Sequence, residues 1–238
     1  MKNEEPQNRH ETKYLISAAQ LPLLRSRIEH IMQPDPHTAE NGCYNIRSVY
    51  FDDYNNRCYY ENENGTDPRE KFRIRIYNHS AEQIRLECKR KQHSKTLKTS
   101  CGLSVEETEK LLHGEPLTNF AELTDLQRKL TLQMQTRLLQ PVVIVEYDRI
   151  PYIYENGNVR VTFDTNLSAS PYVDRFLADG MPKRPVMPVG QLLMEVKFDE
   201  YLPDFIYRAL NLGHLQQTTF SKYYLCRKFN LRKPGGFL

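Results

Sequence analysis

Charged side chains of both signs recur at alternate positions in several short segments of this chain. The densest segment, 69–98, holds ten Lys or Arg and only three acidic residues, although the whole chain carries a net charge of only +3. In an extended strand, residues two apart point to the same face of a sheet. We therefore expect two strands here, joined by a turn near 78–81. Their common face would carry Arg73, Arg75, Arg85, Glu87 and Lys89.

Such a face brings four cations together with a single acid. Like charges side by side repel one another unless an anion or a further acid joins them. Arg offers a planar fork that matches phosphate oxygens, and Lys offers a compact charge. The pattern therefore predicts a site for a polyanion such as a triphosphate chain. The plain alternative is a solvated strand face. Arg73 and Arg75 favour the site, because two arginines beside Lys89 have too few acidic partners.

An acid and a lysine two residues apart occur in three predicted strands. The pairs are Glu11 and Lys13, Glu87 and Lys89, and Glu195 and Lys197. Mg²⁺ and Mn²⁺ take oxygen ligands and bridge phosphates, so the three glutamates are candidate metal ligands. Each glutamate could instead be an ion-pair partner of a neighbouring cation, and of the three we favour Glu195 as the metal ligand. No Ser-His-Asp or Cys-His arrangement is evident, which suits phosphoryl transfer, a chemistry that depends on positioning and charge stabilisation.

Periodicity and turn signals predict the elements that must position these residues. Strands are expected at 9–16, 44–52, 57–61, 69–98 (two strands), 142–154 (a strand pair), 159–164 and 192–198. Helices are expected at 18–32, from the capping box at 104–107 to residue 113, and at 126–139, 204–213 and 222–229. The Pro-rich segment 166–190 is expected to form a long loop.

Two α+β architectures fit this alternation of polar and apolar positions. One is an open antiparallel sheet with its charged face in water. The other is a closed antiparallel β-barrel tunnel with a polar, basic interior, flanked by several α-helices. The excess of cations and the supply of amphipathic helices favour the barrel. At 238 residues we expect a single domain with a core at about 9–229 and a frayed C-terminal tail.

Composition limits the class of protein. An isoelectric point of 8.5 is too mild for a general nucleic-acid coat. The N-terminus has no apolar run that would indicate a signal peptide, and the longest apolar run, 142–145, cannot span a membrane. The five cysteines are scattered and odd in number, which is typical of reduced thiols in the cytoplasm and does not support a zinc site.

An ordered set of motifs resembles the VTC domain, the polyphosphate polymerase domain of the triphosphate tunnel metalloenzyme superfamily. The motifs are His10-Glu-Thr-Lys13-Tyr14, Ser48-Val-Tyr-Phe-Asp52, Phe72-Arg-Ile-Arg75-Ile-Tyr77, Leu86-Glu-Cys-Lys89, Thr96-Leu-Lys98, Val159-Arg-Val-Thr-Phe-Asp164, Leu193-Met-Glu-Val-Lys197 and Phe220-Ser-Lys222. They cover about residues 9–229, nearly the whole chain.

The resemblance implies a barrel tunnel that moves the γ-phosphate of ATP onto a growing polyphosphate chain with Mn²⁺ or Mg²⁺. The family's phosphate-binding residues correspond to Lys13, Arg73, Arg75, Lys89, Lys98, Arg160, Lys197 and Lys222, and its metal-binding glutamate corresponds to Glu195. We assign catalysis to Arg73, Arg75, Lys89 and Arg160, phosphate binding to Lys13, Arg85, Lys98, Lys197, Ser221 and Lys222, and the metal to Glu195, Glu11 and Glu87. Ser221, at a helix start, offers backbone N–H donors.

The wider superfamily often begins with the motif Glu-x-Glu-x-Lys. In this chain position 9 is Arg, so only Glu11-x-Lys13 of that motif remains. This departure favours the polymerase branch over the cyclase and thiamine-triphosphatase branch. The SPX domain and membrane helices of eukaryotic VTC proteins are not found in this sequence, so we expect a stand-alone cytoplasmic domain and leave a membrane-protein partner open.

The expected partners are polyphosphate and ATP or another triphosphate. A triphosphatase that uses the same tunnel and a non-catalytic polyphosphate-binding module are the alternatives. A nucleic-acid partner is not expected, because single-strand binders need stacking aromatics among their cations.

Overall fold

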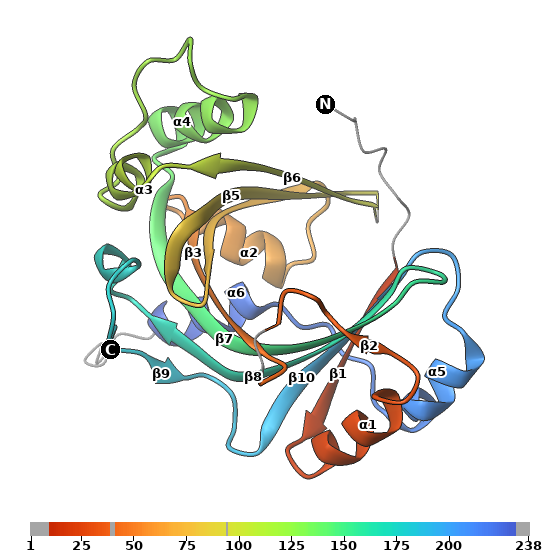
Figure 1. Cartoon of the computed structure of the whole chain (residues 1–238). Coiled ribbons are helices and arrows are strands. Elements are labelled where there is room, and N and C mark those ends of the chain that lie inside the picture. The colour runs from red at the N-terminus through yellow and green to blue at the C-terminus, as the bar shows by residue number, and fades with distance from the viewer. Residues whose placement is uncertain (1–9, 39–40, 94, 232–238) are drawn as a thin grey trace, which may run out of the picture. The chain divides into compact units, whose positions relative to one another are not determined.

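A computed structural model describes residues 10–38, 41–93 and 95–231 of this chain (Figure 1). The strands are β1 His10–Ser17, β2 Gln33–Pro34, β3 Tyr44–Asp52, β4 Arg69–Tyr77, β5 Ser80–Gln92, β6 Lys95–Leu103, β7 Gln140–Tyr154, β8 Val159–Ser170, β9 Arg184–Pro185 and β10 Gln191–Phe198. The α-helices are α1 Gln20–Ile28, α2 Arg57–Glu63, α3 Val105–Leu112, α4 Asp125–Arg137, α5 Asp204–Ala209 and α6 Lys222–Leu231, and the 3₁₀ turns are η1 Val173–Arg175 and η2 Leu212–His214.

The fold is α+β, as expected, and the sheet is mostly antiparallel. Its strands are hydrogen-bonded in the order β1-β10-β8-β7-β3-β4-β5-β6, with β2 paired to β7 and β9 to β8. The predicted closed barrel is not found. The order has two ends, and within the described part of the chain β1 and β6 are not paired, so the sheet is not closed. Side-chain alternation predicts the faces of each strand but carries no information about pairing between the first and last strands.

Contacts along the chain define two compact units. Unit 1 comprises Met1–Asn45, Tyr147–Leu167 and Met187–Phe220, and unit 2 comprises Ile46–Glu146, Ser168–Val186 and Ser221–Leu238. The single domain expected from the sequence stays a prediction. The tail expected to fray, 232–238, lies outside the described residues, and so does the beginning of the expected first strand at residue 9.

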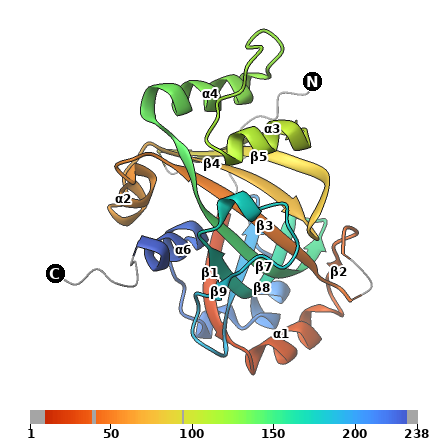
Figure 2. The ribbon, with the colours of Figure 1, turned by 90° about the vertical axis from the view of Figure 1, so that its left-hand side faces the viewer.

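The apolar faces of β4 and β5 form the core of unit 2. Phe72 and Ile74 on β4 and Leu86 on β5 are at most 4 % exposed and pack with Leu111 of α3 and Leu130 of α4. Figure 2 shows α3 beside β5 in this unit, with α4 near by. On β4 and β5, the odd-numbered residues that alternate with Phe72, Ile74 and Leu86 therefore point to the other face of the strand pair.

Two helix starts in unit 2 are fixed by reciprocal capping. Ser104 Oγ accepts a hydrogen bond from the N–H of Glu107, whose carboxylate accepts one from the N–H of Ser104. This confirms the predicted capping box at α3. A second capping box, between Thr124 and Gln127, starts α4 and was not expected.

Unit 1 has a separate core beneath β1, β8 and β10. Ile16, Phe163 and Met194 from these strands are at most 2 % exposed and pack with Ile28 of α1 and Ile206 of α5. The apolar faces of the strands are again covered by helices, as the sequence predicted. In the described residues no helix is both long and apolar enough to cross a membrane.

Several predicted elements differ from those observed. The segment 69–98 contains β4, β5 and the start of β6 rather than two strands, although the expected turn is present with Asn78 and His79 at positive φ. The segment 142–154 is part of one long strand, β7, and not a strand pair. Residues 57–61 lie in helix α2, because the carboxylate of Asp52 accepts the backbone N–H groups of Cys58 and Tyr59 and so fixes its first turn.

The expected loop at 166–190 is partly ordered into strands and a 3₁₀ turn. β8 extends to Ser170, and Ser168 and Ala169 pair with β9. Within unit 2, Arg47 donates hydrogen bonds to the carbonyl oxygens of Phe176 and Ala178, at 2.9 and 2.8 Å. Tertiary contacts of this kind are not visible in the composition of the segment itself.

Candidate functional site

The carboxylate of Glu87 lies at the centre of a cationic cluster in unit 2. Arg73 is its cross-strand partner, and Nε of Arg73 lies 2.6 Å from Oε2 of Glu87. Nζ of Lys98 on β6 lies 2.5 Å from Oε1, and Nη1 of Arg75 lies 4.0 Å from Oε2. These four residues form what we call the Glu87 cluster. It contains three cations and one acid, so it carries more positive than negative charge.

Electrostatics confirm how strongly the cluster favours negative charge. Glu87 is only 4 % exposed, and burial alone would raise the pKa of its carboxyl group. The positive charges of Arg73, Arg75 and Lys98 outweigh burial and lower that pKa to about 2. The carboxylate is therefore ionised at neutral pH and forms ion pairs with the cations that surround it, while its predicted role as a metal ligand stays a prediction.

Strand β3 adds hydroxyl groups to the two arginines. Ser48 and Tyr50 are the cross-strand partners of Arg75 and Arg73. Nε of Arg75 donates to Ser48 Oγ at 3.1 Å, and Nη1 of Arg73 donates to the Tyr50 hydroxyl at 2.9 Å. These contacts hold the guanidinium groups in place, so Arg75, which is 7 % exposed, has a defined orientation.

The positive charges around Glu87 also affect the pKa of the Tyr50 hydroxyl. Burial would raise its pKa, but Arg73, Arg75 and Lys222 lower it below the ordinary value for tyrosine. Lys222 is the first residue of α6, and its positive charge contributes to the lowered pKa of the Tyr50 hydroxyl. Ser221 Oγ accepts a hydrogen bond from the N–H of Tyr224 at 3.3 Å, which makes Ser221 the cap predicted for this helix.

Two predicted cations of unit 2 lie at the edge of this cluster. Arg85 is the cross-strand partner of Arg75, and Lys89 is that of Lys98 on the neighbouring strand. Arg85 and Lys89 are both exposed, in contrast to Arg75, which is buried. Strand alternation placed both on the expected face, but it does not distinguish a buried position from an exposed one.

Two acids and two lysines alternate in a network on β1 and β10 of unit 1. Lys13 pairs in register with Glu195, and Glu11 with Lys197. Nζ of Lys13 lies 2.7 Å from Glu11 and 3.9 Å from Glu195, while Nζ of Lys197 lies 2.8 Å from Glu195 and 3.7 Å from Glu11. Each acid therefore contacts both lysines, and the charges balance.

Arginines on β8 and β7 extend the polar surface of unit 1. Arg160 is the cross-strand partner of Lys197, and its Nη2 donates to Asp35 at 2.6 Å and to the Tyr44 hydroxyl at 2.9 Å. Arg149 forms two hydrogen bonds with the buried carboxylate of Asp164, at 2.7 and 2.8 Å. Burial disfavours the charged guanidinium, but Asp164 outweighs it and raises the pKa of Arg149.

The carboxylates of unit 1 fit a divalent metal that is shared with a substrate. In the described residues no group of three or more His, Cys, Asp or Glu side chains is placed to hold a metal ion. Mg²⁺ is usually bound by one or two carboxylates together with waters and substrate phosphates. Glu11 and Glu195 contact the same two lysines, so they supply such a pair of carboxylates.

The structure thus gathers the predicted residues into two sets, one in each unit. Sequence reasoning missed the hydroxyls of Ser48 and Tyr50 and the role of Asp52, whose Oδ2 accepts the hydroxyl of Tyr223. Ser48 and Tyr50 are two residues apart and so share one face of a predicted strand. This spacing was the available signal that both hydroxyls could belong to one site. Which strand would pair with theirs was not predictable from that spacing.

Comparisons with known proteins agree with these observations. A family model described as the VTC domain matches residues 8–229. A putative adenylate cyclase from Bacillus halodurans has a similar structure, with a TM-score of 0.51, 16 % identity, and 91 % of this chain and 94 % of that chain covered. A putative adenylyl cyclase from Hippeastrum, described as having a dominant triphosphatase activity, has a TM-score of 0.50 and 10 % identity, with 92 % and 96 % covered. At these identities the likeness concerns the fold alone. No curated protein matches the chain in sequence.

Proposed function

Because this chain belongs to the VTC domain family, we propose that it is a metal-dependent polyphosphate polymerase. It would transfer the γ-phosphate of ATP to the end of a polyphosphate chain and release ADP. The observation that carries the proposal is the Glu87 cluster, in which three cations surround one carboxylate. The negative charge that this cluster attracts would be supplied by the phosphates of the substrate.

Arg73 and Arg75 are the residues of unit 2 to which we assign the transferred phosphate. Their guanidinium groups are oriented by hydrogen bonds to Tyr50 and Ser48. Preorganised donors stabilise charge that develops in a transition state, because they need not reorient during the reaction. Further phosphate oxygens would be held by Lys89, Lys98 and Lys222, and by Arg85 at the edge of the cluster. The backbone N–H groups that follow Ser221 at the start of α6 would contribute as well.

In unit 1 we assign phosphate binding to Lys13, Lys197 and Arg160, and metal binding to Glu195 and Glu11. The family implies dependence on a divalent metal, and Mn²⁺ or Mg²⁺ suits the carboxylate pair. A bound metal ion would neutralise charge on phosphate oxygens. The lysines that now balance Glu11 and Glu195 would then be free to contact phosphate.

The proposed transfer needs no protein nucleophile. A terminal oxygen of the polyphosphate chain attacks the γ-phosphorus of ATP, and the bond from that phosphorus to the bridging oxygen of ADP breaks. The electron pair leaves with ADP, and no proton has to move. The protein contributes position and positive charge, which is what phosphoryl transfer requires.

The test is incubation of the purified protein with ATP and Mn²⁺, with polyphosphate read on a gel and ADP and free phosphate measured in parallel. Chains together with ADP are the expected result. The proposal fails if no polyphosphate forms under any primer condition. Free phosphate without chains would indicate a triphosphatase, and tight polyphosphate binding by calorimetry with ATP untouched would indicate a binding module.

A further inference from the structure

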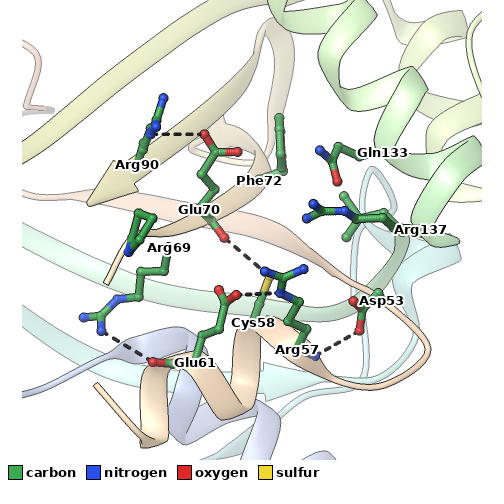
Figure 3. A pocket seen from close by; sticks show the side chains of 12 residues that line it. Asp53, Arg57, Cys58, Glu61, Arg69, Glu70, Phe72, Arg90, Gln133 and Arg137 are labelled. Atoms are coloured by element: carbon green, nitrogen blue, oxygen red, sulfur yellow. Dashed lines mark hydrogen bonds and ion pairs between the residues drawn. The ribbon is translucent and has the colours of Figure 1, made fainter. Parts of the chain in front are cut away.

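A second charged pocket lies within unit 2, on the helix-covered side of the β4–β5 pair (Figure 3). Its volume is about 270 Å³, and residues from α2, β4, β5 and the C-terminal end of α4 line it. Four arginines contribute to the lining: Arg57, Arg69, Arg90 and Arg137. We call it the outer pocket. None of these residues belongs to the set assigned to the proposed polymerase.

The outer pocket and the Glu87 cluster lie on opposite faces of the same two strands. Glu70 and Arg90 are cross-strand partners at the pocket, and Phe72, which also lines it, lies in the apolar core. Arg73 and Glu87 form a cross-strand pair three residues along each strand from Glu70 and Arg90. Strand residues an odd number apart point to opposite faces, so the side chains of Arg73 and Glu87 point away from the pocket. A ligand in the outer pocket is thus separated from the Glu87 cluster by the sheet.

The acids that line the outer pocket already have partners. Glu61 pairs with Arg57 at 2.6 Å, and Glu70 contacts Lys129 of α4 at 2.6 Å and Arg90 at 3.7 Å. Asp53 accepts a hydrogen bond from the backbone N–H of Arg57. The acids are therefore neutralised or occupied, while the arginines outnumber them.

Arg137 differs from Arg57 and Arg90 in having no acidic partner. Within the part of the chain that the structure describes, no carboxylate forms an ion pair with its guanidinium. Figure 3 shows this guanidinium extending into the pocket, on the side where the Arg57 side chain lies. Arg137 is in the last turn of α4, where a cation is favoured by the helix dipole. That effect accounts for Arg137 alone and not for three further arginines around the same cavity.

We propose that the outer pocket binds a small phosphate anion of about the size of pyrophosphate, with Arg57 and Arg137 as its main ligands. Guanidinium groups bind phosphate oxygens through paired N–H donors. The volume lies just below the range of roughly 300–1,000 Å³ that is usual for drug-sized ligands, so it suits a short anion better than a whole nucleotide. This site would be independent of the proposed polymerase reaction.

The test is NMR of the arginine Nε–Hε groups during titration with pyrophosphate, in the wild-type protein and in Arg75→Ala. The Arg75→Ala variant removes a main ligand of the proposed catalytic set and leaves the outer pocket intact. The signals of Arg57 and Arg137 are expected to shift saturably in both proteins. Orthophosphate and ATP, titrated in the same way, are expected to bind more weakly, because one phosphate spans fewer arginines and a nucleotide exceeds the volume.

Two charge-matched variants make the test decisive. Arg137→Gln should weaken pyrophosphate binding at the Arg57 signal about tenfold or more, since it removes a charge-assisted pair of hydrogen bonds. Lys110→Gln on α3 removes the same charge from an exposed site outside the pocket and should leave the affinity unchanged. The proposal is overturned if the Arg57 and Arg137 signals show no saturable shifts at millimolar pyrophosphate, or if both variants have an equal effect. It is also overturned if ATP binds more tightly than pyrophosphate at these two signals. These outcomes are local to the pocket, so they stand whether or not the protein makes polyphosphate.

Discussion

Glu87 and Arg73 face each other across β4 and β5, with 2.6 Å between the carboxylate oxygen and the guanidinium nitrogen. This pair lies at the centre of the Glu87 cluster, since Lys98 and Arg75 approach the same carboxylate. One buried acid thereby holds together three cations that would otherwise repel one another. The cluster is stable as folded, yet it retains the excess of positive charge on which the proposed function rests.

Glu87→Gln is expected to destabilise the protein above about pH 4.5 and to change its acid sensitivity. The folded-state pKa of Glu87, about 2, lies below the ordinary value of 4.5. The stabilisation is therefore present above about pH 4.5 and is lost as the pH falls towards 2. At about 1.36 kcal/mol for each pKa unit, it amounts to about 3 kcal/mol at neutral pH. Denaturant unfolding of both proteins between pH 2 and 7 measures the difference.

Glu106→Gln is the matched control for this prediction. Glu106 pairs with Lys110 on the surface of α3, where its side chain is 78 % exposed, so its loss should change the stability little at any pH. A stability difference between wild type and Glu87→Gln that does not shrink below about pH 4.5 would show that the ion pairs of Glu87 do not contribute as described.

Arg75→Ala is expected to abolish phosphoryl transfer with little loss of folding. It removes one cation from a cluster in which cations are in excess, so the remaining charges repel less. Its guanidinium donates to Ser48 and is buried, so some packing is lost as well. Turnover of ATP should fall by about 100-fold or more, as when one charge-stabilising donor is removed. Lys110→Ala, at an exposed pair on α3, should keep full turnover, and unchanged turnover in Arg75→Ala would refute the assignment.

The fold was predictable where a local pattern decides it. The alternation of Phe72, Ile74 and Leu86 with charged residues predicted both the strands and the helix-covered face, because burial of one face requires a period of two. Closure of the sheet and the helix at 57–63 were not predictable. They depend on pairing between distant strands and on Asp52, which accepts backbone N–H groups from the first turn of α2.

The candidate site was predictable in its charges but not in its geometry. The spacing of Glu11, Lys13, Glu195 and Lys197 placed them on polar strand faces, and the register confirms that they are neighbours. The spacing could not indicate that each acid contacts both lysines. It also gave no sign that Tyr50 would bond to Arg73, because that contact requires β3 to lie beside β4 in one particular register.

Glu195→Gln is expected to raise the concentration of Mn²⁺ needed for half-maximal activity by at least about tenfold. The substitution keeps the size of the side chain but removes one of the two carboxylates that can hold a hard cation. Metal titrations of ATP turnover measure the shift. Glu106→Gln again serves as the control, and an unchanged metal requirement in Glu195→Gln would place the metal elsewhere.

Asp164→Asn is expected to destabilise unit 1 by about 3–5 kcal/mol, which is typical when one partner of a buried ion pair is removed. Asp164 is 1 % exposed and accepts two hydrogen bonds from Arg149, whose charge would be left without its bidentate partner. Thermal or denaturant unfolding measures the loss. Asp199→Asn, at a surface hydrogen bond with Asn158, should have a small effect, and an equally small effect of Asp164→Asn would argue against a structural role for the pair.

Tyr50→Phe tests whether the hydroxyl that contacts Arg73 contributes to anion binding. Its loss frees Nη1 of Arg73 from a hydrogen bond of 2.9 Å, so the guanidinium should become less well oriented and ATP turnover should fall about tenfold. The lowered pKa of Tyr50 gives an independent readout, because its phenol should ionise at lower pH than exposed tyrosines in NMR of labelled protein. Bound tripolyphosphate should raise that pKa again, since it brings negative charge next to the hydroxyl. Tyr54→Phe, at a position 86 % exposed, should alter neither turnover nor the titration of Tyr50. If tripolyphosphate leaves the titration of Tyr50 unchanged while binding elsewhere, the Glu87 cluster is not the phosphate site.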